Sequence, residues 1–397
     1  MKKFIAIALA LVMVLGMCAC GSKTPTESKA PTESKAPETQ APATEAPETD
    51  EPAPAADYKV AMITDYGDIT DESFNQTTYE GCKEFCEANS VDFKYYKPAG
   101  DSDAERIAMV DAAIADGYNV IVMPGYAFAG TIKEEVNLYP DVKFIGLDVS
   151  AGDLGDFELP ENTFCAVYQE ELCGYMAGYA AVKLGYTHLG FLGGMAVPAV
   201  VRYGYGFVQG CDAAAAELGV DVTVEYVYGN QFSGDADITA YMDTWYQTNG
   251  VEVVFACGGG IYISAAEAAA KVEGAKVIGV DVDQAATIDA YGEGMTVTSA
   301  MKGLAATVKA VLGDLILNDN WAEYAGKITT LGLVSGTDVE SNYVQIPYES
   351  TQWSDTFTQE DYVELVGKMF DGTVTVSNDT ETEPEVAITV NYYGNIK

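Results

Sequence analysis

The amino-acid sequence predicts an α/β protein made of two doubly wound lobes, and three observations lead to this fold class. From residue 58 onward, short apolar runs rich in β-branched residues alternate with helical segments, a pattern that favours parallel sheets. These runs are continuously apolar, as strands buried on both faces should be. The pattern restarts near residue 166, and 397 residues exceed what a single core usually holds.

The first series of elements extends over residues 58–165. Its first strand reads Tyr-Lys-Val-Ala-Met-Ile-Thr, and each strand is separated from the next by a segment long enough to form a crossover helix. The expected strands are 58–64, 91–97, 119–124 and 142–148, and the expected helices are 71–89, 102–116 and 129–138. This alternation predicts one parallel sheet with helices on both faces.

The second series begins with an alanine-rich helix and repeats the alternation. Its expected helices are 170–184, 197–218, 236–248 and 264–271, and its expected strands are 187–192, 220–228, 251–256 and 276–280. Residues 295–317 form a further strand and helix, which we expect to return to the first lobe. Lobe 1 is therefore expected to contain 58–165 and 286–335, and lobe 2 to contain 166–285 and 336–397.

The N-terminal stretch is typical of an exported, acylated protein. Two lysines precede an apolar run over 4–17, which has the length of a signal-peptide core and is too short to cross a bilayer well. The segment Ala19-Cys20-Gly21-Ser22 resembles a bacterial lipoprotein cleavage box and favours acylation of Cys20; a plain secretory signal is the alternative. Residues 1–19 are thus a predicted signal peptide and 20–57, rich in Pro, Thr, Glu and Ala, a disordered tether. We expect a lipid-anchored protein on the extracytoplasmic face of the cell membrane.

Charge and composition exclude several classes of function. The formal net charge is −39, with 60 acidic against 21 basic side chains, and such a surface repels nucleic acids. His188 is the single histidine, which disfavours histidine-rich metal sites and mechanisms that need two histidines. No nucleophile elbow, phosphate-binding P-loop or Cys-x-x-Cys pair occurs. We therefore expect a protein that is not an enzyme, with no catalytic residue, no metal and no cofactor.

The cysteines that follow Cys20 are expected to be buried free thiols rather than a disulfide framework, although export would permit disulfides. Two of them are one helical turn apart, and another lies in an apolar strand. These cysteines are Cys82, Cys86, Cys165, Cys173, Cys211 and Cys257.

Motifs at the predicted strand ends resemble those of a known family. Doubly wound lobes bind ligands at the carboxyl ends of their strands, and there the chain carries Ser73-Phe74-Asn75-Gln76 before Tyr79-Glu80-Gly81, then Gly279-Val280-Asp281-x-Asp283-Gln284, then Ser299-x-Met301-Lys302. Over 58–335 these motifs, in this order, resemble the basic membrane protein family, the purine-nucleoside-receptor-like lipoproteins that serve ABC transporters.

The resemblance implies a fold like that of type I periplasmic binding proteins, with a hinge between the lobes. It further implies a monomer that captures a nucleoside and delivers it to an ABC permease encoded elsewhere. In the family, the residues that match Asn75, Asp281 and Lys302 line the nucleoside site, and Phe74 corresponds to a stacking ring. The ring opposite Phe74 stays open between Tyr262 and Phe128.

The residue types fit this ligand class on physical grounds. Aromatic rings hold a flat base by stacking, an amide offers both a donor and an acceptor to a base edge, and a carboxylate binds a sugar diol by charge-assisted hydrogen bonds. Glycines let the backbone approach a ligand closely. The candidate ligand-binding residues are Asp65, Phe74, Asn75, Tyr126, Phe128, Gly258, Gly260, Tyr262, Asp281 and Lys302.

Structural roles compete with these assignments. Phe74 could pack as a helix staple, and Asn75 or Asp281 could cap a helix. Family members often carry an acidic residue where Ala129 and Gly130 stand, so the base end of the site departs from the family more than the sugar end does. The alternative function is therefore the same fold binding a sugar or another small solute for import or sensing.

Overall fold

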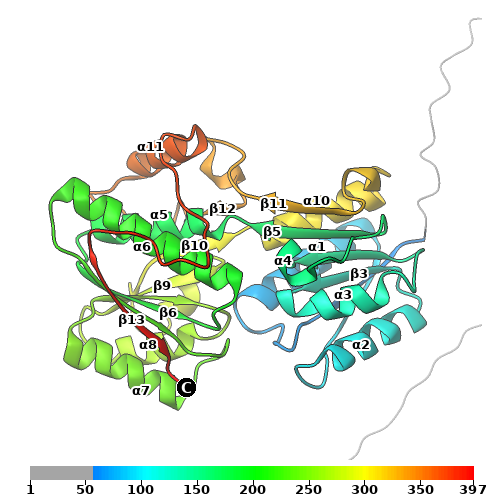
Figure 1. The fold of residues 1–397 in the computed structure, drawn as a ribbon, viewed down its shortest axis with the longest axis horizontal. Helices are drawn as coiled ribbons and strands as arrows, with labels where there is room; N and C mark the ends of the chain where they lie inside the picture. Colours follow the sequence, from blue (N-terminus) through cyan, green and yellow to red (C-terminus); the bar gives the residue numbers. More distant parts are fainter. Residues whose placement is uncertain (1–56) are drawn as a thin grey trace, which may run out of the picture. The chain divides into compact units, whose positions relative to one another are not determined.

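The computed structural model describes residues 57–397. The predicted signal peptide, the predicted acylated Cys20 and all but the last residue of the predicted tether lie outside the described residues. Two sheets organise the described chain, as Figure 1 shows. Within residues 57–397, no helix combines the length and the apolar character that crossing a bilayer requires.

Sheet A has six parallel strands in the order β11-β5-β4-β3-β1-β2. Its central strands are continuously buried, which confirms the reading of uniformly apolar runs as strands covered on both faces. The strands are β1 (Lys59–Ile63), β2 (Asp92–Tyr96), β3 (Val120–Pro124), β4 (Lys143–Leu147), β5 (Thr163–Tyr168) and β11 (Lys327–Leu331).

Helices cover both faces of sheet A. Residues of α1 and α10 share one apolar cluster with alternate strand residues such as Val60 and Met62, while α2 and α3 pack over the other face on Ala61 and Ile63. The helices of this lobe are α1 (Phe74–Asn89), α2 (Asp103–Ala115), α3 (Ala129–Glu135), α4 (Ala151–Leu154) and α10 (Leu304–Ile316).

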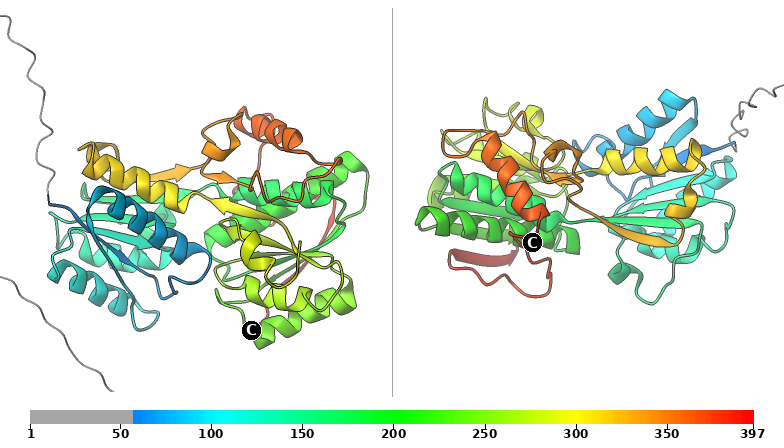
Figure 2. Two further views of the ribbon diagram at one scale, coloured as in Figure 1. Left: turned by 180° about the vertical axis from the view of Figure 1, so that it is seen from behind. Right: turned by 90° about the horizontal axis from the view of Figure 1, so that it is seen from above.

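Sheet B has seven strands in the order β12-β10-β9-β8-β6-β7-β13, and only the pair of β10 and β12 is antiparallel. The strands are β6 (His188–Gly193), β7 (Thr223–Tyr228), β8 (Val253–Cys257), β9 (Lys276–Asp281), β10 (Thr296–Lys302), β12 (Val344–Gln345) and β13 (Thr389–Asn395). The helices of this lobe are α5 (Glu170–Lys183), α6 (Pro198–Leu218), α7 (Ala236–Thr244), α8 (Tyr262–Ala269), α9 (Ala285–Ile288) and α11 (Gln359–Phe370). Figure 2 shows these elements from two further sides.

Three segments carry the chain between the two sheets. The first follows β5, the second follows β10 at Gly303, and the third joins β11 to β12. Because the three crossings lie on the same side of the molecule, as Figure 2 shows, they correspond to the expected hinge. The two-lobed α/β fold predicted from the sequence is confirmed.

The sheets correct the expected division of the chain at two places. Residues 286–335 are expected in lobe 1, but β10 pairs with β9 in sheet B, and only α10 and β11 join sheet A. The expected boundary after residue 165 also falls inside β5. Strands buried in either sheet carry the same apolar pattern, so the pattern predicts that a strand exists and not which sheet it enters.

The expectation about the cysteines is confirmed for six of them. Every cysteine from Cys82 to Cys257 is a buried free thiol. Burial raises the pKa of these thiols; that of Cys165 rises to about 12. They act as small apolar side chains of the core.

Candidate ligand-binding site

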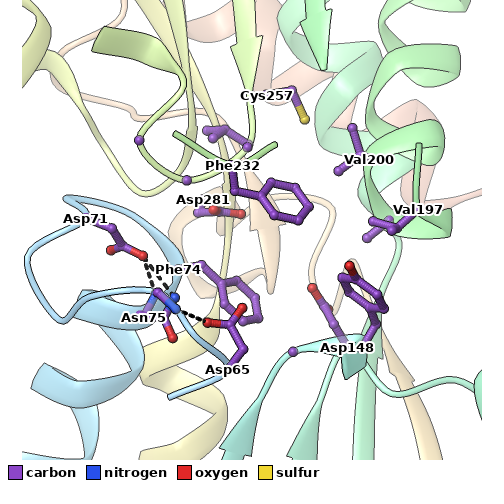
Figure 3. A pocket seen from close by; sticks show the side chains of 18 of the residues that line it. Asp65, Asp71, Phe74, Asn75, Asp148, Val197, Val200, Phe232, Cys257 and Asp281 are labelled. Atoms are coloured by element: carbon purple, nitrogen blue, oxygen red, sulfur yellow. Dashed lines mark hydrogen bonds between the residues drawn. The ribbon is translucent and has the colours of Figure 1, made fainter. Parts of the chain in front are cut away.

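A cavity of about 520 Å³ lies at the carboxyl ends of the strands of both sheets. Asp65 and Asp148, which follow β1 and β4, contribute to it from lobe 1, while Cys257 and Asp281, which end β8 and β9, contribute from lobe 2. Figure 3 shows these side chains around one shared space. The volume is within the range of pockets that enclose small ligands.

Eight of the ten candidate residues line this cavity. They come from segments separated by up to 237 positions, from Asp65 to Lys302, and the fold brings them together at the strand ends. These eight residues are Asp65, Phe74, Asn75, Tyr126, Gly258, Gly260, Asp281 and Lys302.

Lys302 is the centre of a buried charge network that joins the two sheets. Its Nζ atom lies 2.5 Å from Oδ2 of Asp148, 3.4 Å from Oε1 of Glu170 and 3.9 Å from Oδ1 of Asp281. Arg202 donates from Nε to Oε2 of Glu170 over 2.7 Å. Burial alone lowers the pKa of Lys302, but the three carboxylates outweigh it and hold the pKa above its ordinary value. Lys302 therefore keeps its positive charge.

Asp281 is held by both lobes. The Ser73 hydroxyl donates to its Oδ2 over 2.6 Å, and the Tyr203 hydroxyl donates to its Oδ1 over 3.4 Å. Burial raises the pKa of the Asp281 carboxyl, while Lys302 and Ser73 oppose the rise. The carboxylate is thus fixed in place at the cavity wall, where it can accept hydrogen bonds from ligand hydroxyls.

Backbone conformations at two strand ends are unusual. Asp281 has φ of 65° and Asp148 has φ of 58°, in the left-handed region that non-glycine residues seldom adopt and that Asp tolerates better than most. Both residues directly follow or end a strand and both line the cavity. Strain of this kind concentrates at functional sites, which supports the cavity as the site of binding.

Asn75 lines the cavity and has an acceptor without a partner among the described residues. Its backbone N–H and its Nδ2 both donate to Oδ2 of Asp71, over 2.9 Å and 3.1 Å, and Asp71 also caps α1 by accepting from the N–H groups of Ser73 and Gln76. The Asn75 Oδ1 atom is buried and has no partner among the described residues. Because the amide nitrogen is already held, the oxygen is the part of Asn75 that is free to bind a ligand donor.

Asp65 lies beside Asn75, as Figure 3 shows. Its Oδ1 accepts from the backbone N–H groups of Tyr66 and Gly67 over 2.6 Å and 2.7 Å. Burial raises the pKa of the Asp65 carboxyl, and these N–H groups oppose the rise. This end of the cavity therefore offers several oxygen acceptors close together.

Two phenylalanine rings enter the cavity from different lobes. Phe74 begins α1, and the Lys302 ammonium lies 4.9 Å from its ring centroid. Phe232 comes from the loop after β7, where a Cβ at Gly194 or Gly258 would collide with its ring. Figure 3 shows both rings directed into the same space. Rings from two lobes can close on the two faces of a flat ligand.

Phe128 and Tyr262 do not reach the cavity, which corrects the expectation for both. Phe128 is fully buried under α2 and α3, in the core on one face of sheet A. Tyr262 is packed in the apolar core beneath α7 and α8. Both residues follow a strand closely. Phe128 directly precedes α3 and Tyr262 begins α8, and each ring packs with the buried face of its helix. The ring contributed by lobe 2 is instead Phe232.

Other cavity residues obey the same strand-end rule but are not among the ten candidates predicted from the sequence. Asp148 directly follows β4, and Phe232 lies four residues after β7, so the rule that identified Asp65 and Asp281 could have found both. Arg202 and Tyr203 lie inside α6, and no local pattern distinguishes them from other helical residues. Their place at the cavity depends on how α6 packs.

Each cationic side chain that lines the cavity forms an ion pair with at least one carboxylate. Lys97 pairs with Asp68 over 2.7 Å, Arg202 with Glu170, and Lys302 with three carboxylates. Between residues 57 and 397, no cluster of histidine, cysteine and carboxylate side chains has the arrangement of a metal site. The arrangement suits a neutral ligand that has hydroxyl or N–H donors and an apolar face.

Comparisons with known proteins agree with this arrangement. A family model described as "ABC transporter substrate-binding protein PnrA-like" matches residues 58–364. Basic membrane protein B of Borreliella afzelii is 27% identical over 296 residues, which are 73% of this chain and 82% of that protein. The "ABC transporter nucleoside-binding protein BmpA" of Lactococcus lactis is 26% identical over 240 residues, which are 57% of this chain and 65% of that protein.

Solved structures show the same fold. A solute-binding protein of an ABC transporter system from Aeropyrum pernix superposes with a TM-score of 0.62 at 22% identity, covering 81% of this chain and 88% of that chain. A second solute-binding protein of this kind, from Conexibacter woesei, superposes with a TM-score of 0.62 at 20% identity, covering 81% of this chain and 99% of that chain. With a matching family model over most of the described residues, the chain belongs to the PnrA-like family of ABC transporter substrate-binding proteins, and it is a solute-binding protein and not an enzyme.

Proposed function

We propose that the solute is a nucleoside, bound in the cavity between the two lobes. The observation that carries the proposal is the polarity of the cavity. Asp281, a carboxylate fixed between Ser73 and Lys302, lines the cavity, and so does Asn75, whose Oδ1 atom lacks a partner among the described residues. Phe74 and Phe232 add two aromatic rings to the cavity wall.

Each part matches one part of a nucleoside. A carboxylate accepts from the two hydroxyls of a ribose, an amide oxygen accepts from an N–H of a base, and two rings stack on the base. The name of the Lactococcus lactis relative, a nucleoside-binding protein, points to the same ligand class.

Delivery to an ABC importer completes the proposal. Acylation of Cys20 would anchor the protein on the extracytoplasmic face of the membrane, as the names of two archaeal relatives, lipoproteins of Pyrococcus abyssi and Pyrococcus furiosus, suggest for those proteins. In this proposal the protein works as a monomer, which closes its lobes on the ligand and then docks on the permease.

The test is a binding screen with the protein lacking residues 1–19. Inosine, guanosine and adenosine are compared with the free bases and with ribose, first by thermal shift and then by calorimetry. A ligand at about 100 times its Kd adds about 2.7 kcal/mol to the free energy of unfolding, which a shift of several degrees reports.

Two results separate the outcomes. A shift with a nucleoside and none with the free bases or ribose supports the proposal, and an Asp281→Asn variant should then lose most of the shift. A clear shift with a sugar alone, and none with any nucleoside, contradicts the nucleoside and leaves the family assignment unchanged.

A further inference from the structure

The C-terminal part of the chain adds a strand that lies outside the family match. The match ends at residue 364, whereas β13 covers Thr389–Asn395 and forms the parallel edge strand of sheet B beside β7. Residues 371–388 first cross the outer side of α6, as the red segment in Figure 1 shows. There Ser377 exchanges two hydrogen bonds with Gln209, of 2.9 Å and 3.0 Å, and Asp212 accepts from the N–H groups of Ala387 and Ile388.

Polar side chains fasten the middle of β13 to its neighbours. Glu225 of β7 accepts from the Tyr393 hydroxyl over 2.5 Å and from Asn391 Nδ2 over 3.2 Å. His188 of β6 lies 3.0 Å from the other oxygen of Glu225. The carboxylate is thus shared among three strands, so β13 is bonded to side chains as well as to the backbone of the sheet.

The end of β13 reaches the strand ends at which the cavity lies. Ile396 donates its N–H to the Tyr228 carbonyl over 2.8 Å, and its side chain packs against the core beneath α7 and α8. Lys397 forms an ion pair with Asp235. The Asp235 carboxylate also accepts from Gln231 Nε2, over 3.0 Å, and from the N–H groups of Asp237 and Ile238 in α7. The Asp235 backbone N–H donates to the Ser264 hydroxyl over 2.9 Å.

The loop over residues 229–235 is therefore held from two sides, and it carries Phe232. On the cavity side, Gly260 donates its N–H to the Phe232 carbonyl over 2.9 Å, and Gly234 donates to the Gly260 carbonyl over 3.2 Å. On the outer side, the Tyr228 carbonyl and Asp235 are bonded by Ile396 and Lys397. Tyr228 directly precedes the loop, and Asp235 is its last residue.

We propose that the end of β13 is a positioning element for the ligand cavity, in which Ile396 and Lys397 hold the 229–235 loop so that Phe232 meets the ligand. The proposal rests on the proposed function, because the ligand that Phe232 meets is taken to be a nucleoside. Neither Ile396 nor Lys397 lines the cavity. Both act through the loop, and they are positioning residues.

The expected effects are local. The Lys397–Asp235 pair is partly exposed to solvent, and such pairs contribute little to global stability. Loss of the pair or of the Ile396 packing should therefore loosen the loop without unfolding the lobe. We expect affinity for the nucleoside to fall about two- to fivefold, the range that one partly exposed ion pair supports.

The experiment compares Lys397→Met and Ile396→Ala with Lys368→Met. Lys368 lies on α11 and pairs with Glu364 over 2.6 Å in a more exposed pair, so its replacement changes the net charge equally, away from the loop. Hydrogen exchange of the ligand-free proteins is followed at Asn230, Gly234 and Gly260, whose N–H groups are bonded within this region. Calorimetry then measures Kd for inosine, guanosine and adenosine.

Support requires faster exchange at these amides in Lys397→Met and Ile396→Ala but not in Lys368→Met, together with weaker binding of a nucleoside that the wild type binds. In a Phe232→Ala background, Lys397→Met should then weaken binding no further, because its effect passes through Phe232. Unchanged exchange overturns the proposal, and so does faster exchange with unchanged affinity. If the wild type binds none of the three nucleosides, the proposed function fails, while the exchange rates still support or overturn the positioning of the loop.

Discussion

The Nζ atom of Lys302, at the end of β10, lies 2.5 Å from Oδ2 of Asp148, which follows β4, so a strand of sheet B is bonded to a strand end of sheet A. A second bond across the sheets joins the Ser73 hydroxyl to Asp281 over 2.6 Å. Lys302, Asp148 and Asp281 all line the cavity. The closure of the lobes and the shape of the binding site therefore depend on the same few side chains.

Replacing Lys302 by methionine should destabilise the protein strongly. Asp148, Glu170 and Asp281 would then be buried without their shared cation, and breaking a buried pair in this way costs about 3–5 kcal/mol. Thermal denaturation of Lys302→Met measures the loss. Lys309→Met, which removes an exposed pair with Glu84, serves as the control and should change stability by less than about 1 kcal/mol. Equal stability of the two variants would contradict the role of the network.

Phe232 and Tyr262 should respond oppositely to substitution. Phe232→Ala removes a ring from the cavity wall and should weaken nucleoside binding by about 1–3 kcal/mol, the contribution of one stacked base. Tyr262→Ala removes a buried ring from the core of sheet B and should lower the melting temperature, with a free-energy loss of about 3 kcal/mol or more. Calorimetry and thermal denaturation of both variants distinguish the roles. A Tyr262 variant that folds normally but loses binding would restore the expectation drawn from the sequence.

Nucleoside 5′-phosphates should bind at least about tenfold more weakly than the nucleosides. The lining cations Lys97, Arg202 and Lys302 are already paired with carboxylates, and an anion entering the cavity would face several unneutralised aspartates. Calorimetry of inosine against inosine 5′-phosphate at one ionic strength makes the comparison. Comparable affinity for the two would show that a cation leaves its partner to receive the phosphate.

Glu171 should make the stability depend on pH. Burial raises the pKa of its carboxyl to about 7 from 4.5, and its Oε2 atom has no partner among the described residues. Between these values the folded protein binds more protons than the unfolded chain, so the free energy of unfolding should fall as pH rises from about 5 to 8, by up to about 3 kcal/mol. Denaturant titrations over this range measure the slope. Glu171→Gln should flatten it and stabilise the protein at pH 8; an unchanged slope would assign the dependence to other groups.

Gly174→Ala should disrupt the contact between α5 and α6. A Cβ at Gly174 would collide with the backbone carbonyl of Tyr203, and Gly206 and Gly210 are equally close to the backbone of α5. Since backbone cannot give way as a side chain can, the two helices must separate, at a cost of about 1–3 kcal/mol or more. Gly152→Ala, at a glycine whose Cβ would make only an ordinary contact with the Ser150 hydroxyl, 3.5 Å away, is the control. Chemical denaturation should show a loss for the first variant and almost none for the second.

Much of the fold could be predicted because its strands are short, apolar and regularly spaced. The strand expected over 119–124 is β3, and the helix expected over 170–184 is α5. The sheet that each strand enters could not be predicted: β10 has the same apolar pattern as a strand of either lobe, and only its pairing with β9 assigns it to sheet B. The apolar pattern of a strand indicates that the strand is buried. The neighbouring strand with which it pairs depends on the packing of the whole chain.

The candidate site, like the fold, could be predicted only in part from the sequence. Asp65 and Asp281 could be identified because they follow predicted strands, and Asn75 because it stands in a motif that resembles the family. Tyr262 also follows a strand, yet it faces the core. A shift of about 100° per residue in a helical turn decides whether a ring faces a cavity or a core, and sequence position does not fix that rotation before the helix is packed.

By itself the sequence determined the two-lobed α/β fold, the strand ends at which a ligand would bind and the family to which the chain is similar, because these follow from periodicity and from local motifs. Only the tertiary structure decided that β10 enters sheet B, that Phe232 is the ring contributed by lobe 2, and that Lys302 shares three carboxylates. These relationships join residues that are far apart in the chain. Their free energies arise from burial and charge in a shared space that exists only after both sheets have packed.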